Sequence, residues 1–131
     1  MDIVLDTSAY SHFRNNHRAV VDALAHAERV YVPVIVLGEL EAAFRIGSRA
    51  AENRARLAEF LDEEFVETVA LSREIAVRYG EVFAALRAAG TPIPINDVWI
   101  AATALQLASQ LLTFDRDFER VGSLDVRVLA P

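Results

Sequence analysis

The stretch that decides the fold is INDVWIAATALQLASQLLTFDRDF, residues 95–118. After Asp97 its first half is almost wholly apolar and helix-forming, which predicts a buried helix. Leu111–Phe114 then form a short apolar run of strand length, and Asp115 follows this run directly. A helix that leads into a buried strand is typical of βαβ units, so the stretch predicts an α/β fold with a parallel sheet.

The remainder of the chain continues this alternation. Four further apolar runs predict strands at Ile3–Leu5, Val30–Val32, Phe65–Val69 and Val126–Leu129. Helical spacing predicts a helix that continues to about Glu28, one from Pro33 to Gly47, one over 50–63, and a long one that ends near Gly90. Since the 131 residues contain no linker or repeat, we expect a single domain, 1–131, with a mostly parallel five-stranded sheet flanked by helices.

The composition excludes several classes of function. The chain has no Cys, so disulfides and thiolate metal ligands are absent. The longest apolar run, from Val30 to Leu37, is interrupted by Pro33 and is far shorter than the roughly 20 residues of a membrane span. The N-terminus has no basic flank, so we expect no signal peptide and a cytoplasmic protein. A net charge of −6 argues against a protein that coats nucleic acid through bulk positive charge.

Four acidic residues are expected at one edge of the sheet. Ligands of open parallel sheets bind beyond the carboxyl ends of the strands. Asp6 and Asp115 each follow a predicted strand directly. Asp97 begins the helix that runs back toward the start of the fourth strand, and Glu39 lies about two turns into the helix after the second strand. The topology therefore predicts that these four side chains converge.

Convergence of four carboxylates is unfavourable unless a cation binds them. Two like charges about 4 Å apart repel by roughly 4 kcal/mol at an effective dielectric constant of 20. A ligand set made only of oxygen favours a hard ion, Mg²⁺ or Mn²⁺. Such ions can hold the attacking and leaving oxygens of a phosphodiester. The sequence therefore predicts metal-assisted phosphodiester hydrolysis, with Asp6, Glu39, Asp97 and Asp115 as catalytic and metal-binding residues.

Each of these acids also has a local explanation. Asp6 could cap the helix that follows it, and Asn96–Asp97 is an ordinary helix start. Glu39 could be a solvated surface residue, and Asp115 could only shape the turn in FDRDF. The joint placement of the four at one sheet edge is what favours a shared site.

Four segments together resemble a known family. IVLDTS (3–8), PVIVLGELE (33–41), INDVWIAATAL (95–105) and LLTFDRDF (111–118) resemble the motifs of the PIN domain. More narrowly, they are similar to those of the VapC-type toxins of bacterial toxin–antitoxin pairs. The resemblance covers essentially the whole chain, in the family's order, and the last two motifs together are quite specific.

The resemblance implies a PIN-like three-layer sandwich and an endoribonuclease dependent on Mg²⁺ or Mn²⁺, which cleaves tRNA, rRNA or mRNA and so inhibits translation. It implies that Asp6, Asp97 and Asp115 bind metal directly, and that Glu39 does so directly or through water. It also implies a homodimer and a small antitoxin whose C-terminal segment covers the toxin and blocks its site.

Several further residues are expected around this site. By the resemblance, Thr7, Ser8 and Thr113 support the pocket through hydrogen bonds, whereas Asp117 falls at a more variable position. All 13 basic residues are Arg, and those that flank the acidic motifs could contact RNA phosphates: Arg14, Arg18, Arg45, Arg49, Arg116 and Arg120. We expect the histidines to be solvated or capping and Trp99 to lie in the core; the histidines are His12, His17 and His26.

Other enzyme classes fit the sequence less well, and two other functions stay open. A receiver domain needs a Lys, which the chain lacks, and a P-loop needs clustered glycines, which are dispersed here. A haloacid-dehalogenase phosphatase needs a second Asp where Ser8 stands. A housekeeping or structure-specific PIN nuclease remains an alternative, as does a binding module that has kept the fold and lost catalysis.

Overall fold

A computed structural model describes all residues from 1 to 131. Its strands are β1 (Asp2–Leu5), β2 (Arg29–Pro33), β3 (Val66–Val69), β4 (Gln110–Thr113) and β5 (Val126–Val128). Its helices are α1 (Thr7–Arg14), α2 (Arg18–His26), α3 (Val34–Ile46), α4 (Ala50–Leu61), α5 (Arg73–Ala89), α6 (Ile95–Gln106) and the short 3₁₀ helix η1 (Arg116–Arg120). The predicted α/β class is confirmed, and every predicted strand lies within one residue of an observed one.

The five strands form one sheet in the order β3-β2-β1-β4-β5, and every pairing between neighbours is parallel. The chain builds the sheet outward from β1 to β3 and then returns to the other side of β1 for β4 and β5. The order of the strands therefore reverses between β1 and β4. In open α/β sheets the carboxyl end of such a reversal is where ligands bind.

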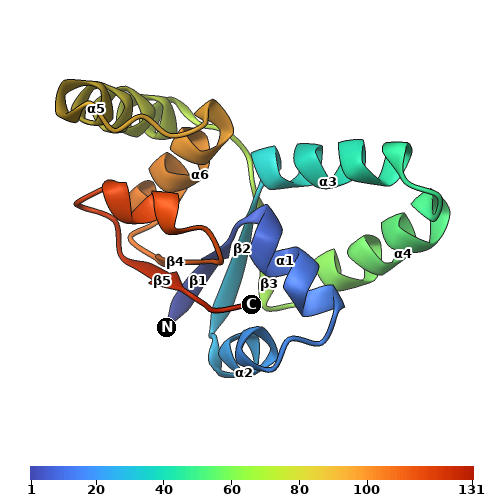
Figure 1. Ribbon diagram of the computed structural model, residues 1–131. Coiled ribbons are helices and arrows are strands. Elements are labelled where there is room, and N and C mark those ends of the chain that lie inside the picture. Colours follow the sequence, from blue (N-terminus) through green and yellow to red (C-terminus); the bar gives the residue numbers. More distant parts are fainter.

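The central strands are fully buried, because helices lie on both sides of the sheet (Figure 1). Val4 and Leu5 of β1 and Leu111 and Leu112 of β4 have no exposed surface. They belong to one hydrophobic core of 28 buried residues that extends into all the major helices. This continuous apolar burial on both faces is what parallel strands require, and it makes the reversal point rigid.

The first helical region differs from the prediction of one helix that continues to about Glu28. Residues 7–26 form two helices, α1 and α2, joined by a tight turn. Asn16 in this turn has a φ angle of 58°, in the left-handed region that Asn tolerates better than most residues. The apolar spacing continues across the turn, so hydrophobic periodicity alone does not reveal the break.

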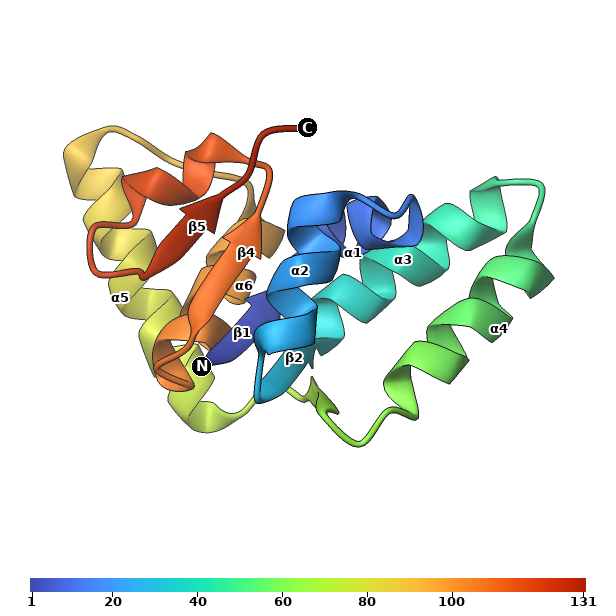
Figure 2. The ribbon, with the colours of Figure 1, turned by 90° about the horizontal axis from the view of Figure 1, so that it is seen from below.

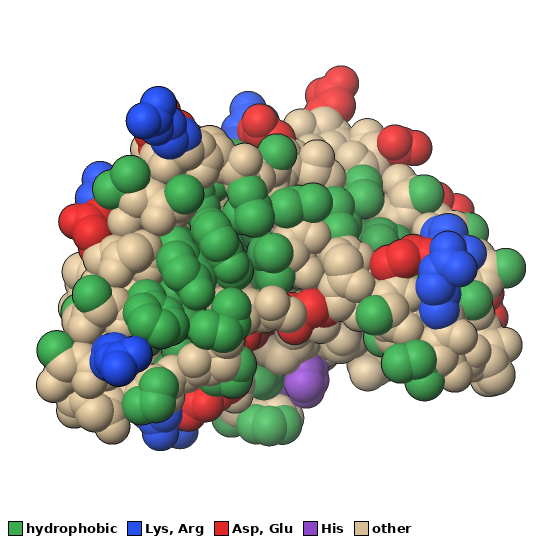
Figure 3. Space-filling model, turned by 90° about the horizontal axis from the view of Figure 1, so that it is seen from above, with side chains coloured by type: hydrophobic (Ala, Val, Ile, Leu, Met, Phe, Trp, Pro, Cys, Tyr) green, Lys and Arg blue, Asp and Glu red, His purple; other side chains and the backbone are tan.

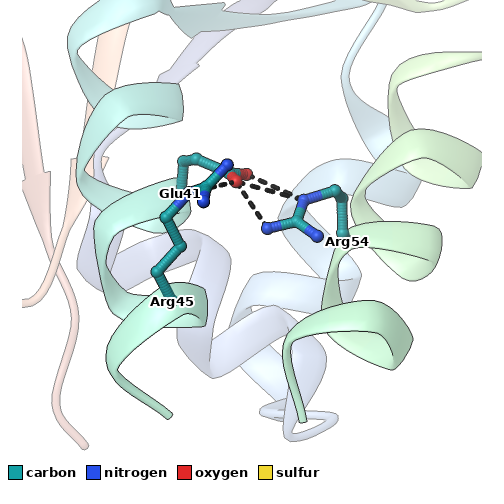
Figure 4. A network of polar contacts seen from close by, with 3 residues as sticks. All are labelled: Glu41, Arg45 and Arg54. Carbon is teal, nitrogen blue, oxygen red and sulfur yellow. Dashed lines mark hydrogen bonds and ion pairs between the residues drawn. The ribbon is translucent and has the colours of Figure 1, made fainter.

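Helices α3 and α4 form a hairpin that extends away from the sheet (Figures 1 and 2). An exposed ion network joins the two helices. The guanidinium of Arg54 on α4 donates three hydrogen bonds to the Glu41 carboxylate on α3, and Arg45 pairs with the same carboxylate (Figure 4). These hydrogen bonds and charges lower the pKa of Glu41. The carboxylate of Glu41 is thus neutralised by arginines, in contrast to that of Glu39 two residues earlier.

No helix of the structure combines the length and the apolar character that a membrane crossing requires.

Candidate active site

Asp6 is held rigidly at the carboxyl end of β1. Its Oδ1 accepts hydrogen bonds from the Ala9 N–H and the Ser8 hydroxyl, both at 2.8 Å, and its Oδ2 accepts one from the Thr113 hydroxyl. Its backbone N–H donates to the Leu112 carbonyl on β4 at 3.4 Å. Asp6 is only 5% exposed. It therefore caps α1, as the local explanation holds, and it also joins the ends of two strands.

Asp115 occupies the corresponding position after β4. Its N–H donates to the Thr113 hydroxyl oxygen at 3.0 Å, and its Oδ1 accepts from the Asp117 N–H at 2.9 Å, which caps η1. Thr113 therefore contacts both acids, because its hydroxyl donates to Asp6 and accepts from the backbone of Asp115. The hydroxyl of Thr113 thus connects the loop after β1 with the loop after β4.

Glu39 of α3 points to this same edge. Its Oε1 accepts from the Thr7 hydroxyl at 2.6 Å, and its Oε2 accepts from the Asn96 side-chain amide at 3.4 Å. Glu39 is half-buried, so it is not a solvated surface residue. Asn96 is a site residue that the sequence did not single out beyond its place at the helix start. The signal for it was its position directly before Asp97.

Asp97 lies in the first turn of α6, whose first residue is Ile95, and its side chain makes no capping hydrogen bond. Asp97 therefore lies at a helix start, as the local explanation holds, but it does not cap the helix. Burial raises the pKa of Asp97 to about 7, and the charges of Asp115, Glu39, Asp6 and Asp117 raise it in the same direction. The structure thus brings the four predicted acids together, with Asp117 beside them.

The pKa of Asp6 is also raised, first by burial and to a smaller extent by the charge of Asp115. The hydrogen bonds from Thr113, Ala9 and Ser8 act against this rise. The ionised form of Asp6 is therefore unfavourable in the folded protein, although three hydrogen-bond donors stabilise it. A cation bound at this edge would relieve the unfavourable electrostatics of both Asp6 and Asp97.

The donor set fits a hard divalent ion in its chemistry, because it consists of carboxylate oxygens with hydroxyl and amide groups behind them. No three His, Cys, Asp or Glu side chains are placed so that they could hold an ion directly. Mg²⁺ retains several waters and is usually held by one or two carboxylates, so an open arrangement of this kind suits a hydrated ion.

The expectation for Trp99 is wrong, because Trp99 is only half-buried and its ring stacks on Tyr79 of α5 at 4.1 Å between centroids instead of lying in the core. The expectation for the histidines holds for His17, which stands at the N-cap position of α2, and for the exposed His26. His12 differs, because it is partly buried with its ring stacked on Phe114 at 3.7 Å between centroids, and His17 packs edge-on against both rings. His26 is exposed, and its Nδ1 donates to the Asp22 carbonyl.

The arginines expected near RNA have different surroundings. Arg116 is 81% exposed and pairs with Glu119 at 3.2 Å, while Arg120 pairs with Asp117 at 3.6 Å. The guanidinium of Arg14 lies over the rings of Phe13 and Tyr10. Exposed ion pairs contribute little stability, so Arg116 can exchange its partner for a phosphate.

A cavity of about 610 Å³ lies elsewhere on the molecule. It is lined by residues of α5, α6 and the segment from η1 to β5, including Arg78, Glu81 and Arg120, and by none of the four acids. The candidate site is therefore defined by converging charges at the sheet edge and not by this cavity.

Comparison with known proteins identifies the class to which this fold and acidic edge belong. The family model described as "PIN domain" matches residues 3–124, which is nearly the whole chain. The chain therefore belongs to the PIN-domain family.

Within this family the chain is similar to ribonucleases named VapC. It is 32% identical to ribonuclease VapC1 of Haemophilus influenzae (strain R2866) over 130 residues, which covers 95% of each chain. It is 30% identical to ribonuclease VapC4 of Mycobacterium tuberculosis over 95 residues, 72% of this chain and 73% of that protein.

Solved structures of VapC complexes share the fold. VapBC2 from Rickettsia felis, bound to a DNA fragment from the promoter, superposes with a TM-score of 0.87 at 24% identity, covering 98% of this chain and 99% of the other. VapBC-1 from nontypeable Haemophilus influenzae gives a TM-score of 0.86 at 23% identity, covering 98% of both. The predicted PIN-like architecture is confirmed.

The raised pKa of Asp97 predicts how stability depends on pH in the metal-free protein. The folded state keeps the Asp97 proton up to about pH 7, whereas the unfolded state loses it near the ordinary aspartate pKa of 3.8. Stability therefore falls as pH rises between these values. Asp97→Asn should raise the free energy of unfolding at pH 8 by about 1–2 kcal/mol, less than the full shift implies because solvent screens a partly exposed group.

Urea unfolding in EDTA at pH 4 and pH 8 measures this effect. The variant should gain stability over the wild type only at the higher pH. Asp125→Asn is the matched control, since Asp125 is exposed and lies outside the acidic cluster. Identical pH dependence of Asp97→Asn and the wild type would contradict the convergence of charges described above.

Proposed function

We propose that the chain is a metal-dependent endoribonuclease of the VapC type, a toxin that inhibits translation by cleaving tRNA, rRNA or mRNA and is neutralised by a cognate antitoxin. The observation that carries the proposal is the meeting of Asp6, Glu39, Asp97 and Asp115 at the strand-order reversal. Similarity to proteins named ribonuclease VapC over nearly the whole chain supports it.

In this proposal Asp6, Asp97 and Asp115, together with Glu39, hold a hydrated Mg²⁺ or Mn²⁺. One or two of these carboxylates contact the ion directly and the others bind it through its waters, since no three of them are placed to contact one ion together. The ion, when bound, supplies an activated water and charge stabilisation for the phosphodiester oxygens. Asp97 must release its proton before it serves as a ligand, which the neighbouring acids oppose until a cation is present. One of the four acids orients the attacking water or accepts its proton.

The supporting residues act by fixing these carboxylates. Thr113 and Ser8 hold Asp6, and Thr7 and Asn96 hold Glu39. Such partners keep a ligand in one rotamer, so that its carboxylate faces the same point in every molecule. Asp117 adds negative charge near Asp97, and its backbone N–H donates to the Asp115 carboxylate, which caps η1.

Cleavage of RNA in the presence of Mn²⁺ tests the proposed activity. Asp97→Asn and Glu39→Gln should each lower the cleavage rate by about 100-fold or more, because each removes an ionisable group from the reacting centre. Glu41→Gln is the matched control on the same helix, since Glu41 is neutralised by Arg54 and Arg45. Gel assays of a labelled RNA measure the rates. Full activity in either site variant would refute the assignment.

The proposed cellular role gives a second prediction. Expression of the wild-type chain should arrest growth, Asp97→Asn should not, and co-expression of a small protein encoded directly upstream should restore growth. Such a protein would be the antitoxin, and the site of action would be the cytoplasm, as the sequence suggests. Normal growth of cells that accumulate the folded wild-type chain would count against a toxin.

A housekeeping or structure-specific PIN nuclease is the runner-up. It would cleave RNA in vitro with the same acids, so the growth experiment separates it from a toxin. A non-catalytic binding module is less well supported, since a fold without catalysis has no need for carboxylates that raise one another's pKa.

We also propose that the chain forms a homodimer through the face of α5 and α6. Tyr79 stacks on both Phe83 and Trp99, and this aromatic group stays partly exposed. Ile95 and Val34, at the starts of α6 and α3, are 50% and 41% exposed. Figure 3 shows a broad hydrophobic area on the face seen from above, with acidic side chains beside it. Apolar patches of this kind favour burial against a second copy.

Sedimentation at micromolar concentration tests the dimer. Ile95→Arg should convert it to a monomer, because a charge buried in an apolar interface has no partner. Ile46→Arg is the matched control, since Ile46 is 88% exposed at the far end of α3. A monomeric wild type, or a dimer that tolerates Ile95→Arg, would refute this surface.

A further inference from the structure

Two aromatic rings from distant parts of the chain stack next to the acids. The rings of His12 on α1 and Phe114 after β4 lie 3.7 Å apart between centroids at an interplanar angle of 16°. His17 packs against them edge-on, with its centroid 5.6 Å from that of His12 and 5.0 Å from that of Phe114. We call the His12–Phe114 pair the aromatic platform.

The platform is tied to the acidic site through Ser8. The His12 Nδ1 donates to the Ser8 carbonyl at 2.9 Å, and the Phe114 N–H donates to the Ser8 hydroxyl oxygen at 3.1 Å. The same hydroxyl donates to Asp6 at 2.8 Å, and Phe114 directly precedes Asp115. Phe114 is therefore adjacent in sequence to one proposed metal ligand, Asp115, and Ser8 joins both rings of the platform to a second, Asp6.

The platform is not part of the buried core. Phe118, four residues after Phe114, is completely buried, whereas His12 and Phe114 are both only partly buried. The His17 Nε2 donates to the Ala130 carbonyl at 2.9 Å. This bond fixes the His17 ring, which packs edge-on against His12 and Phe114. Phe114 packs against the core, and both rings of the pair keep part of their surface exposed.

The charge of the protein makes such a contact useful for binding RNA. The chain has a net charge of −6, so its arginines bind RNA phosphates against an overall negative potential. Phosphate contacts alone therefore provide limited affinity. Base stacking on aromatic rings contributes affinity that does not need positive charge, and single-stranded RNA exposes its bases for it.

We propose that the aromatic platform stacks an unpaired RNA base beside the scissile phosphate, so that His12 and Phe114 help to select single-stranded substrate. This inference rests on the proposed ribonuclease function. It adds a binding contact that the four acids do not supply, and it assigns the partly exposed rings a role in positioning RNA over the acidic edge.

Steady-state cleavage of a single-stranded oligoribonucleotide tests the platform. His12→Ala should raise KM about tenfold, equivalent to about 1.4 kcal/mol, and leave kcat within about twofold. His12→Phe should restore most of the affinity, because it keeps a ring over Phe114. His26→Ala is the matched control: His26 makes the same Nδ1 bond to the carbonyl four residues earlier but has no ring stacked on it.

Binding provides the second arm of the experiment. In the Asp97→Asn background, an oligoribonucleotide that carries 2-aminopurine should show fluorescence quenching on binding, and His12→Ala should abolish most of it. His12→Leu fills the same space without an aromatic ring and replaces the Ala variant if that variant melts early. The thermal shift produced by Mn²⁺ in the otherwise wild-type chain should be unchanged by His12→Ala, which shows that the acids remain in place.

The outcomes separate the two proposals. Wild-type affinity and quenching in His12→Ala overturn the platform while the ribonuclease stands. A fall in kcat with unchanged KM overturns it as well, because His12 would then only position the acids. Quenching that depends on His12 in a chain that never cleaves RNA supports the platform and refutes the nuclease. Absence of RNA binding by the wild type overturns both.

Discussion

Parallel pairing of β1 with β4 places Leu5 opposite Leu112, so the residues that follow both strands leave the sheet at the same edge. Asp6 and Asp115 meet there because the strand order reverses between these two strands and not elsewhere. Their mutual repulsion would separate two flexible loops, but the strands behind them are fully buried and cannot shift. The buried core thus holds the two carboxylates closer together than their repulsion alone would allow. Helices α3 and α6, which begin at the same edge of the sheet, bring Glu39 and Asp97 to the same place.

The class of fold could be predicted because alternating apolar runs and helical spacing directly reflect burial. The strands were located to within one residue for this reason. Two features lay beyond such reasoning. The break between α1 and α2 depends on one residue, Asn16, whose left-handed backbone leaves no trace in the apolar pattern. Trp99 lies in an apolar helix, yet it faces Tyr79 at the surface, because the direction in which a helix faces is set by its neighbours and not by its own sequence.

The acids could be predicted from topology alone, since residues that follow parallel strands share an edge. The family resemblance also pointed to Thr7, Ser8 and Thr113 as their hydrogen-bonding support, and the structure shows these bonds. Two other contacts could not be predicted. Asn96 reaches Glu39 across 57 positions of sequence, and His12 meets Phe114 only after the sheet has closed. Two of the acids have both of the roles considered from the sequence: Asp6 caps α1 and Asp115 caps η1, and both also lie at the acidic edge of the sheet. A capping residue is therefore a reasonable place for a metal ligand, since the cap fixes one oxygen and leaves the carboxylate oriented.

The stacking of Trp99 on Tyr79 has a spectroscopic consequence. The chain contains one tryptophan, and it lies on the α5–α6 face beside the acidic edge instead of in the sheet. Its emission therefore monitors the surroundings of one helix pair, two residues along α6 from Asp97. Unfolding followed through this fluorophore reports the separation of α5 from α6, and agreement with far-ultraviolet circular dichroism would mean that this pair and the sheet melt as one cooperative unit.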